Sequence, residues 1–116
     1  MDMIKRIVFR HMDHSDIMEQ HISEQFAKVE DFLLHEPDPI YIDIILEPSK
    51  TREHHRVEIR VKTPHYEICS DYEGPKMYEV IDRVIDTLYR ELHEHKRKRH
   101  DHLKEVGRHD EFKKQR

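Results

Sequence analysis

Apolar and polar residues follow two different periods along the chain, one of two residues as in strands and one of three to four residues as in helices. The first two segments are a short strand-like stretch and then a helical repeat. The segment IKRIVF contains Ile4, Ile7 and Phe9 and has the length of a strand. From Ser15, a suitable helix N-cap, apolar residues recur every three or four positions, as in an amphipathic helix. These are Met18, Ile22, Phe26, Val29 and Leu33. The EPDP run at 36–39 ends the segment, because proline cannot continue a helix. We predict a strand and then a helix of about five turns.

Three further segments have the two-residue period of strands with one buried face. They cover residues 40–47, 56–62 and 65–72, and polar turn residues at 48–55 and 63–64 separate them. The apolar positions are Ile40, Ile42, Ile44, Leu46, Val57, Ile59, Val61, Tyr66 and Ile68. The connections are short, so we predict an antiparallel meander.

The last periodic segment is a second helix. Gly74-Pro75 precedes it, and we place Pro75 at the first helical position, where its missing N–H costs nothing. The apolar positions that follow are Met77, Ile81, Val84, Ile85, Leu88 and Leu92. No residue from His93 to Glu105 breaks a helix, so the helix is predicted to project beyond the core and to stop at Gly107.

The predicted order is β-α-β-β-β-α, an α+β fold in which two helices cover one face of a four-stranded sheet and the other face is open. A chain of 116 residues holds one such domain. We assign residues 1–100 to this domain and residues 101–116 to a charged, flexible C-terminal tail.

The composition indicates the cellular compartment of the protein and excludes some kinds of site. Cys69 is the single cysteine, which excludes an intramolecular disulfide and a multi-cysteine zinc site and suits a reducing cytoplasm. We expect a buried, inert thiol. The N-terminal residues MDMIKRIVFR contain no apolar run of signal-peptide length, and no segment approaches the roughly 20 apolar residues that span a bilayer. We expect a soluble cytoplasmic protein.

Catalytic patterns are missing from the sequence. The two glycines cannot form a phosphate-binding loop, and no serine lies in a nucleophile-elbow context. The carboxylates lie on outward faces without an apolar setting that would raise a pKa. We therefore expect no enzyme, no catalytic residues, no cofactor and no small-molecule substrate.

Histidine is abundant, with 12 residues, and this raises the possibility of a metal site. His93 and His95, however, are two positions apart and lie about 200° around a helix, on nearly opposite sides. We favour solvated imidazoles over a metal site. A response to pH is a further possibility, since histidine titrates near neutrality.

The distribution of charge singles out the C-terminal end. Residues 1–89 carry 11 Lys and Arg against 19 Asp and Glu, whereas residues 90–116 carry 10 against 6. The tract HKRKRH at 95–100 has two interpretations of equal weight. It is either a solvated helix end opposite the C-terminal dipole or a phosphate-binding surface continued by Arg83 and Arg90.

The second helix also carries a family resemblance. Its matching positions are Met77-Tyr78, Ile81-Asp82, Leu88, Arg90, Leu92 and His95-Lys96, and FAKVEDF in the first helix matches as well. These residues resemble the ribosome hibernation factors, a family that includes hibernation promoting factor and ribosome-associated inhibitor A and is also called sigma-54 modulation proteins. The resemblance covers about residues 3–100.

The resemblance implies a fold like the double-stranded-RNA-binding domain. It also implies a function that depends on occupying a site rather than on a catalytic step. The protein would occupy the messenger channel and the A- and P-site tRNA region of the small ribosomal subunit, and would inhibit translation in stationary phase or stress. Separately, we expect it to be a monomer. The chain resembles the short type, without the domain by which long members dimerise ribosomes. Whether it promotes or opposes ribosome dimers stays open.

The same resemblance suggests the contacts with rRNA. Lys28, Arg90 and Lys96 occupy basic positions of the family pattern, and we add four neighbouring cations: Arg83, Arg97, Lys98 and Arg99. Three positions depart from the pattern, because Lys76 replaces an acidic residue and Thr87 and Glu94 stand where lysine is frequent. Two alternatives remain: a protein-interaction module such as a sigma-factor modulator, and a histidine-dependent metal-binding protein.

Overall fold

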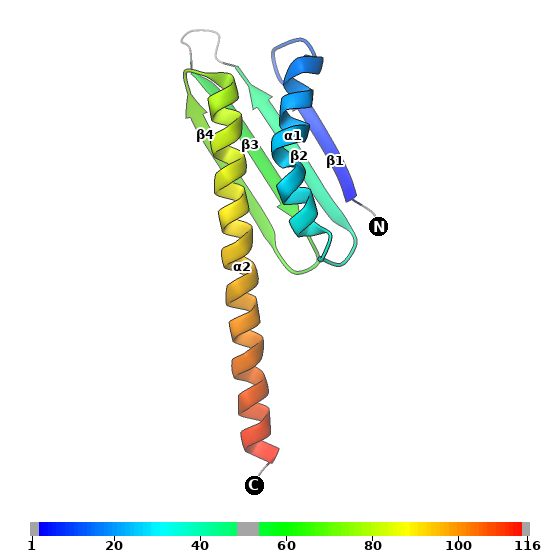
Figure 1. Ribbon diagram of the computed structural model, residues 1–116, viewed down its shortest axis with the longest axis vertical. Coiled ribbons are helices and arrows are strands. Elements are labelled where there is room, and N and C mark those ends of the chain that lie inside the picture. Colours follow the sequence, from blue (N-terminus) through cyan, green and yellow to red (C-terminus); the bar gives the residue numbers. More distant parts are fainter. Residues whose placement is uncertain (1–2, 49–53, 115–116) are drawn as a thin grey trace.

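The six predicted elements are all present in the computed structural model (Figure 1). The structure describes residues 3–48 and 54–114, with side chains as far as residue 103. The elements are β1 (Met3–Phe9), α1 (Asp16–Leu33), β2 (Ile40–Glu47), β3 (His55–Lys62), β4 (Glu67–Gly74) and α2 (Met77–Lys114). The predicted turn at 48–55 lies largely outside the described residues.

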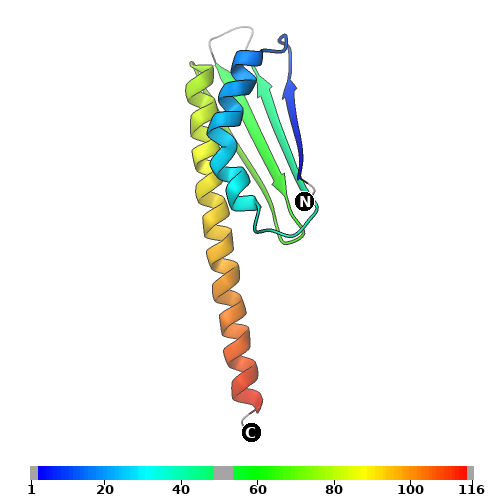
Figure 2. The ribbon, with the colours of Figure 1, turned by 45° about the vertical axis from the view of Figure 1, so that its right-hand side comes forward.

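The strands form one mixed sheet in the order β1-β2-β3-β4. β1 and β2 are parallel, with Met3 beside Ile40, because α1 carries the chain back to the starting edge. The other two pairs are antiparallel, which confirms the predicted meander. Both helices lie on the same face of the sheet (Figures 1 and 2). The predicted α+β fold is therefore confirmed.

The hydrophobic core fills the space between the sheet and the helices. α1 contributes the predicted residues Ile22, Phe26, Val29 and Leu33, and the strands contribute alternate residues such as Ile42 and Ile59. α2 contributes a stripe that ends at Leu92. Each large apolar side chain buried in this way stabilises the fold by about 1.5–3 kcal/mol relative to an exposed one.

The two helices begin differently. At α1, Ser15 is the predicted N-cap, and its Oγ accepts a hydrogen bond from the backbone N–H of Met18 at 3.2 Å. At α2, the prediction for Pro75 is wrong, since the helix begins at Met77. β4 continues through Gly74, where an added Cβ would lie 3.1 Å from Val80. The strand therefore ends against the helix, and Pro75 belongs to the link between them.

α2 continues well beyond the core. Leu92 is its last buried residue, and every side chain described after it is exposed. The helix passes through Gly107 to Lys114, so the predicted stop at Gly107 is wrong. A single glycine costs a helix only about 1 kcal/mol, and no proline follows it. We refer to residues 93–114 as the α2 overhang, which gives the molecule its length of 67 Å.

The open face of the sheet is charged, and the cysteine lies on it. In one row of the register, Asp43, Arg60 and Cys69 are neighbours across three strands. Cys69 is exposed, and its thiol donates to Glu58 Oε1 at 3.3 Å. The prediction of a buried thiol is wrong, because the pleat of β4 directs Ile68 into the core and its neighbour Cys69 outward.

Candidate nucleic-acid interface

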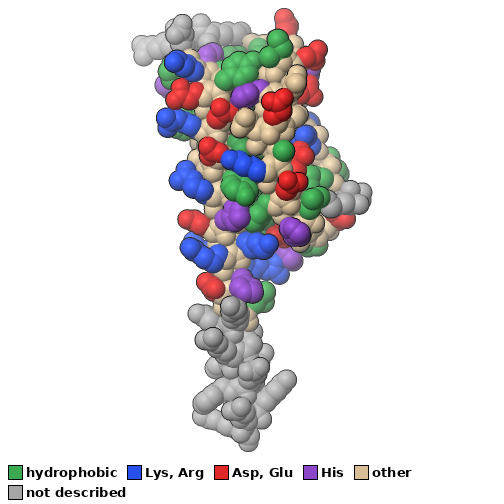
Figure 3. Space-filling view, viewed as in Figure 1, with side chains coloured by type: hydrophobic (Ala, Val, Ile, Leu, Met, Phe, Trp, Pro, Cys, Tyr) green, Lys and Arg blue, Asp and Glu red, His purple; other side chains and the backbone are tan. Residues whose placement is uncertain are grey.

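Three of the predicted basic residues form a line along the outer surface of α2. Arg83, Arg90 and Arg97 are spaced by seven residues, which is nearly two helical turns, and all three are exposed. We call these three residues the arginine stripe. Figure 3 shows Lys and Arg side chains at intervals along α2, with acidic side chains between them. Arg83 also contacts Glu79, at 3.4 Å, and lies 5.4 Å from the Tyr72 ring centre.

Lys28 lies beside this line, on α1. Its ammonium donates a hydrogen bond to Asp86 of α2 and lies 5.1 Å from the centre of the Tyr89 ring. The structure thus brings the predicted residue of the first helix to the same surface as the arginine stripe. The carboxylate of Asp86 already offsets the positive charge of Lys28.

The four consecutive cations of the overhang do not form one surface. Lys96 Nζ lies 5.1 Å from the centre of the Phe32 ring, facing α1. Lys98 is two residues further, about 200° around the helix, and so faces nearly the opposite way. Arg97 and Arg99 fall between these directions, and with Lys96 they line a cavity. Lys98 therefore faces away from Lys96 and does not line this cavity.

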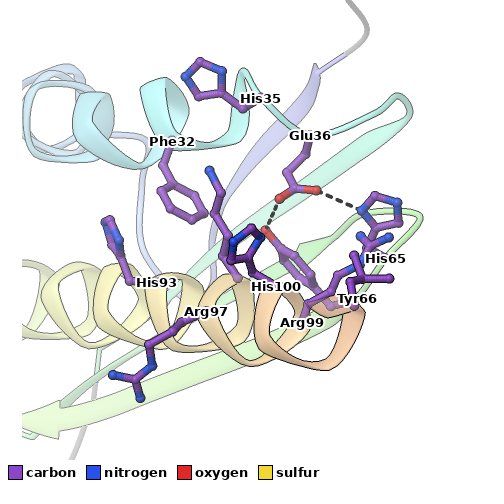
Figure 4. A pocket seen from close by; sticks show the side chains of 11 residues that line it. Phe32, His35, Glu36, His65, Tyr66, His93, Arg97, Arg99 and His100 are labelled. Carbon is purple, nitrogen blue, oxygen red and sulfur yellow. Dashed lines mark hydrogen bonds and ion pairs between the residues drawn. The ribbon is translucent and has the colours of Figure 1, made fainter. Parts of the chain in front are cut away.

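This cavity, which we call the α1–α2 groove, lies where the overhang leaves the body, and has a volume of about 680 Å³. Its walls come from three parts of the chain (Figure 4). The end of α1 and the β3–β4 turn face the overhang across it. The lining residues are Phe32, His35, Glu36, His65, Tyr66, His93, Lys96, Arg97, Arg99, His100 and Leu103. Sequence reasoning missed the groove, because no single segment contains more than part of it.

Hydrogen bonds fix one wall of the groove. Glu36 is largely buried, and its carboxylate accepts from the Tyr66 hydroxyl at 3.2 Å and contacts His65 Nδ1 at 3.1 Å (Figure 4). Burial raises the pKa of Tyr66 well above its usual range, and Glu36 raises it further, while Arg99 opposes the shift. Tyr66 is therefore held as a neutral hydrogen-bond donor.

Aromatic rings meet at the other wall. The His93 ring lies 4.6 Å from Phe32 and 4.5 Å from Tyr89, measured between ring centres. His95 instead lies 5.8 Å from Tyr66, on the sheet side of α2. The two histidines thus pack against different rings on different sides of the helix, as their two-residue spacing predicts.

One cluster among the described side chains has donors suitable for a metal ion: His14, Asp16 and Glu19. It lies at the start of α1 rather than on the overhang. His14 Nε2 is 2.9 Å from Asp16 and 2.8 Å from Glu19, so one imidazole nitrogen contacts both carboxylates. The helix N-terminus also favours these carboxylates.

The sequence of this domain matches a known family over most of its length. The profile of the family described as sigma 54 modulation protein / S30EA ribosomal protein matches residues 6–100. The chain belongs to this family. All seven predicted rRNA contacts lie inside the matched residues, and the overhang from Asp101 onward lies outside them. The expected family is confirmed, and it is one of ribosome-associated factors rather than enzymes.

Solved structures show the same fold. The N-terminal domain of Protein Y from Thermus thermophilus is 20% identical, with a TM-score of 0.63. A ribosomal subunit interface protein from Coxiella burnetii is 21% identical, with a TM-score of 0.64. Each comparison covers 79% of this chain and 96% of the other. No curated protein sequence matches significantly.

Neither of the helices described has an apolar stretch that could span a bilayer.

Proposed function

We propose that the chain binds the small ribosomal subunit over the messenger channel and the A- and P-site tRNA region, and inhibits translation in stationary phase or stress. It acts as a monomer and by occupancy, without a catalytic step or a cofactor, and such a role places it in the cytoplasm. The observation that carries the proposal is the arginine stripe on α2, inside the part of the chain that matches the ribosomal family.

The arrangement of charge suits rRNA. The formal net charge is −4, yet 10 of the 21 Lys and Arg residues lie in residues 90–116. An acidic body is repelled by phosphate, so binding must use the basic helix, and this orients the molecule. Neighbouring arginines of the stripe lie about 10 Å apart along the axis, so each can contact a different phosphate.

Co-sedimentation with purified small subunits tests the proposal. Binding should weaken as salt rises, because each neutralised phosphate releases counterions. A variant with Lys28, Arg90, Lys96 and Arg97 all changed to Glu should lose binding. The matched control changes Arg60 and Lys62, on the open sheet face, to Glu and should bind normally. Footprinting of the rRNA then locates the site.

Two results would contradict the proposal. The first is binding that persists unchanged in the four-residue variant. The second is a pull-down from stationary-phase lysate that recovers one protein and no rRNA. That result would favour the alternative of a sigma-factor modulator, which the family description also names.

A further inference from the structure

The α1–α2 groove has the properties of a binding site for a flat, partly apolar and negatively charged molecule. We propose that it binds one unpaired nucleotide of an RNA strand, with the base against Phe32 and Tyr66 and the adjoining phosphate on Lys96 and Arg99. This inference deepens the proposed function and rests on it for the source of the RNA.

The aromatic wall supplies a stacking surface. Phe32, from α1, and Tyr66, from the β3–β4 turn, both line the groove, and both are only partly buried, so part of each ring remains available. Leu103 adds an apolar side chain that is 55% exposed. Stacking on aromatic side chains is the usual way in which proteins hold unpaired bases. The groove volume of about 680 Å³ lies within the range of pockets that hold small ligands.

The charged side chains favour an anion next to that base. Lys96 holds its ammonium 5.1 Å from the centre of the Phe32 ring. Arg99 lies close enough to Tyr66 to lower its pKa against the effect of burial. Among the lining residues, Glu36 alone is acidic, and it is engaged by Tyr66 and His65. The groove therefore presents net positive charge beside an aromatic surface.

A connection to the arginine stripe favours an RNA strand over a free nucleotide. Arg97 belongs to both surfaces, since it lines the groove and continues the line of Arg83 and Arg90. In Figure 4 its guanidinium points away from Glu36, out of the groove. A strand whose phosphates follow the stripe would thus reach the groove without leaving the surface of α2.

Fluorescence anisotropy on the full chain tests the site, with fluorescein-labelled hexauridylate and hexaadenylate as probes. Phe32→Leu, which keeps an apolar side chain, should weaken binding about tenfold, as expected for the loss of one stacked base. Arg99→Glu should weaken it at least as much. The matched controls are Tyr41→Leu and Lys62→Glu on the open sheet face, and each should change the affinity less than twofold.

Competitors and crosslinking define the ligand. A 12-base-pair RNA duplex and free AMP should each compete at least tenfold more weakly than the unlabelled hexamer. A hexamer containing 4-thiouridine should crosslink to peptides that contain Phe32 or Tyr66. Equal competition by the duplex, equal competition by AMP, or crosslinks confined to other peptides would each overturn the proposal.

The same variants separate this inference from the proposed function. If Phe32→Leu and Arg99→Glu, each with unchanged circular dichroism, bind the hexamers as the wild type does, the groove is excluded while subunit binding can stand. If the wild type binds hexamers through the groove but does not sediment with small subunits, the proposed function fails and the groove site remains.

Discussion

Lys28 of α1 donates a hydrogen bond to Asp86 of α2 across the interface of the two helices. The same ammonium lies over the Tyr89 ring. α1 places one of the seven predicted rRNA contacts on this surface, and Asp86 offsets its charge. The carboxylate thus limits how strongly α1 can attract phosphate, although the ion pair is exposed enough to exchange Asp86 for another anion.

Asp86→Asn should therefore tighten binding to small subunits, by about threefold at low salt. The freed Lys28 should also make the dependence of log K on log salt steeper by about one unit. Stability should change little, because exposed ion pairs contribute only about 0–1 kcal/mol. Asp71→Asn is the matched control, since it removes one carboxylate partner of Arg56 on the open face. An unchanged salt dependence for Asp86→Asn would contradict this account.

The boundary between core and overhang can be tested by two leucine substitutions on α2. Leu92 is fully buried and Leu103 is 55% exposed. Leu92→Ala should lower the free energy of unfolding by about 2–5 kcal/mol, because it leaves a cavity. Leu103→Ala should change it by less than about 0.5 kcal/mol. Urea titrations followed by circular dichroism measure both, and equal losses would show that the core extends along the overhang.

Tyr66 should make stability depend on alkaline pH. Its pKa is raised in the folded state, by burial and then by Glu36, whereas an unfolded tyrosine ionises near pH 10. Its contribution to stability is therefore complete below about pH 10 and falls as the pH rises further. Between pH 9 and pH 11 the urea midpoint of the wild type should fall more than that of Tyr66→Phe. Equal falls would contradict the raised pKa.

The thiol of Cys69 should react slowly even though it is exposed. Partial desolvation raises its pKa and the hydrogen bond to Glu58 raises it further, with Arg60 opposing, so less thiolate is present at a given pH. Alkylation by iodoacetamide at pH 8 should be several times slower than in urea. Glu58→Gln should accelerate the reaction of the folded chain, and Glu67→Gln, on the same strand as Cys69, should not.

The sequence was a good guide to the fold because each element has its own period. The four apolar residues at alternate positions from Ile40 to Leu46 are all buried, and the α1 stripe begins at the Ser15 cap as predicted. The errors concern positions where local preference competes with tertiary structure. Pro75 can start a helix but here links two packed elements, and Cys69 follows the pleat of its strand rather than its own hydrophobicity.

The candidate site was less predictable, because the charge of a residue does not tell which way its side chain faces. Lys96 and Lys98 are equivalent in composition but face nearly opposite ways, and Lys28 has a carboxylate partner 58 residues away. The groove depends on the approach of Phe32, Tyr66 and Lys96, which no local pattern connects. All seven cations lie within the residues that match the family.

The parallel pairing of β1 with β2 has a consequence for folding. Partners in that pair, such as Arg6 and Asp43, are separated by 37 residues, whereas Lys62 and Glu67 join β3 to β4 only five residues apart. Closing the longer loop costs more entropy, and every residue of β1 keeps some exposure. We therefore expect β1 to join the sheet last and to detach first, and its backbone amides to exchange with deuterium before those of β3.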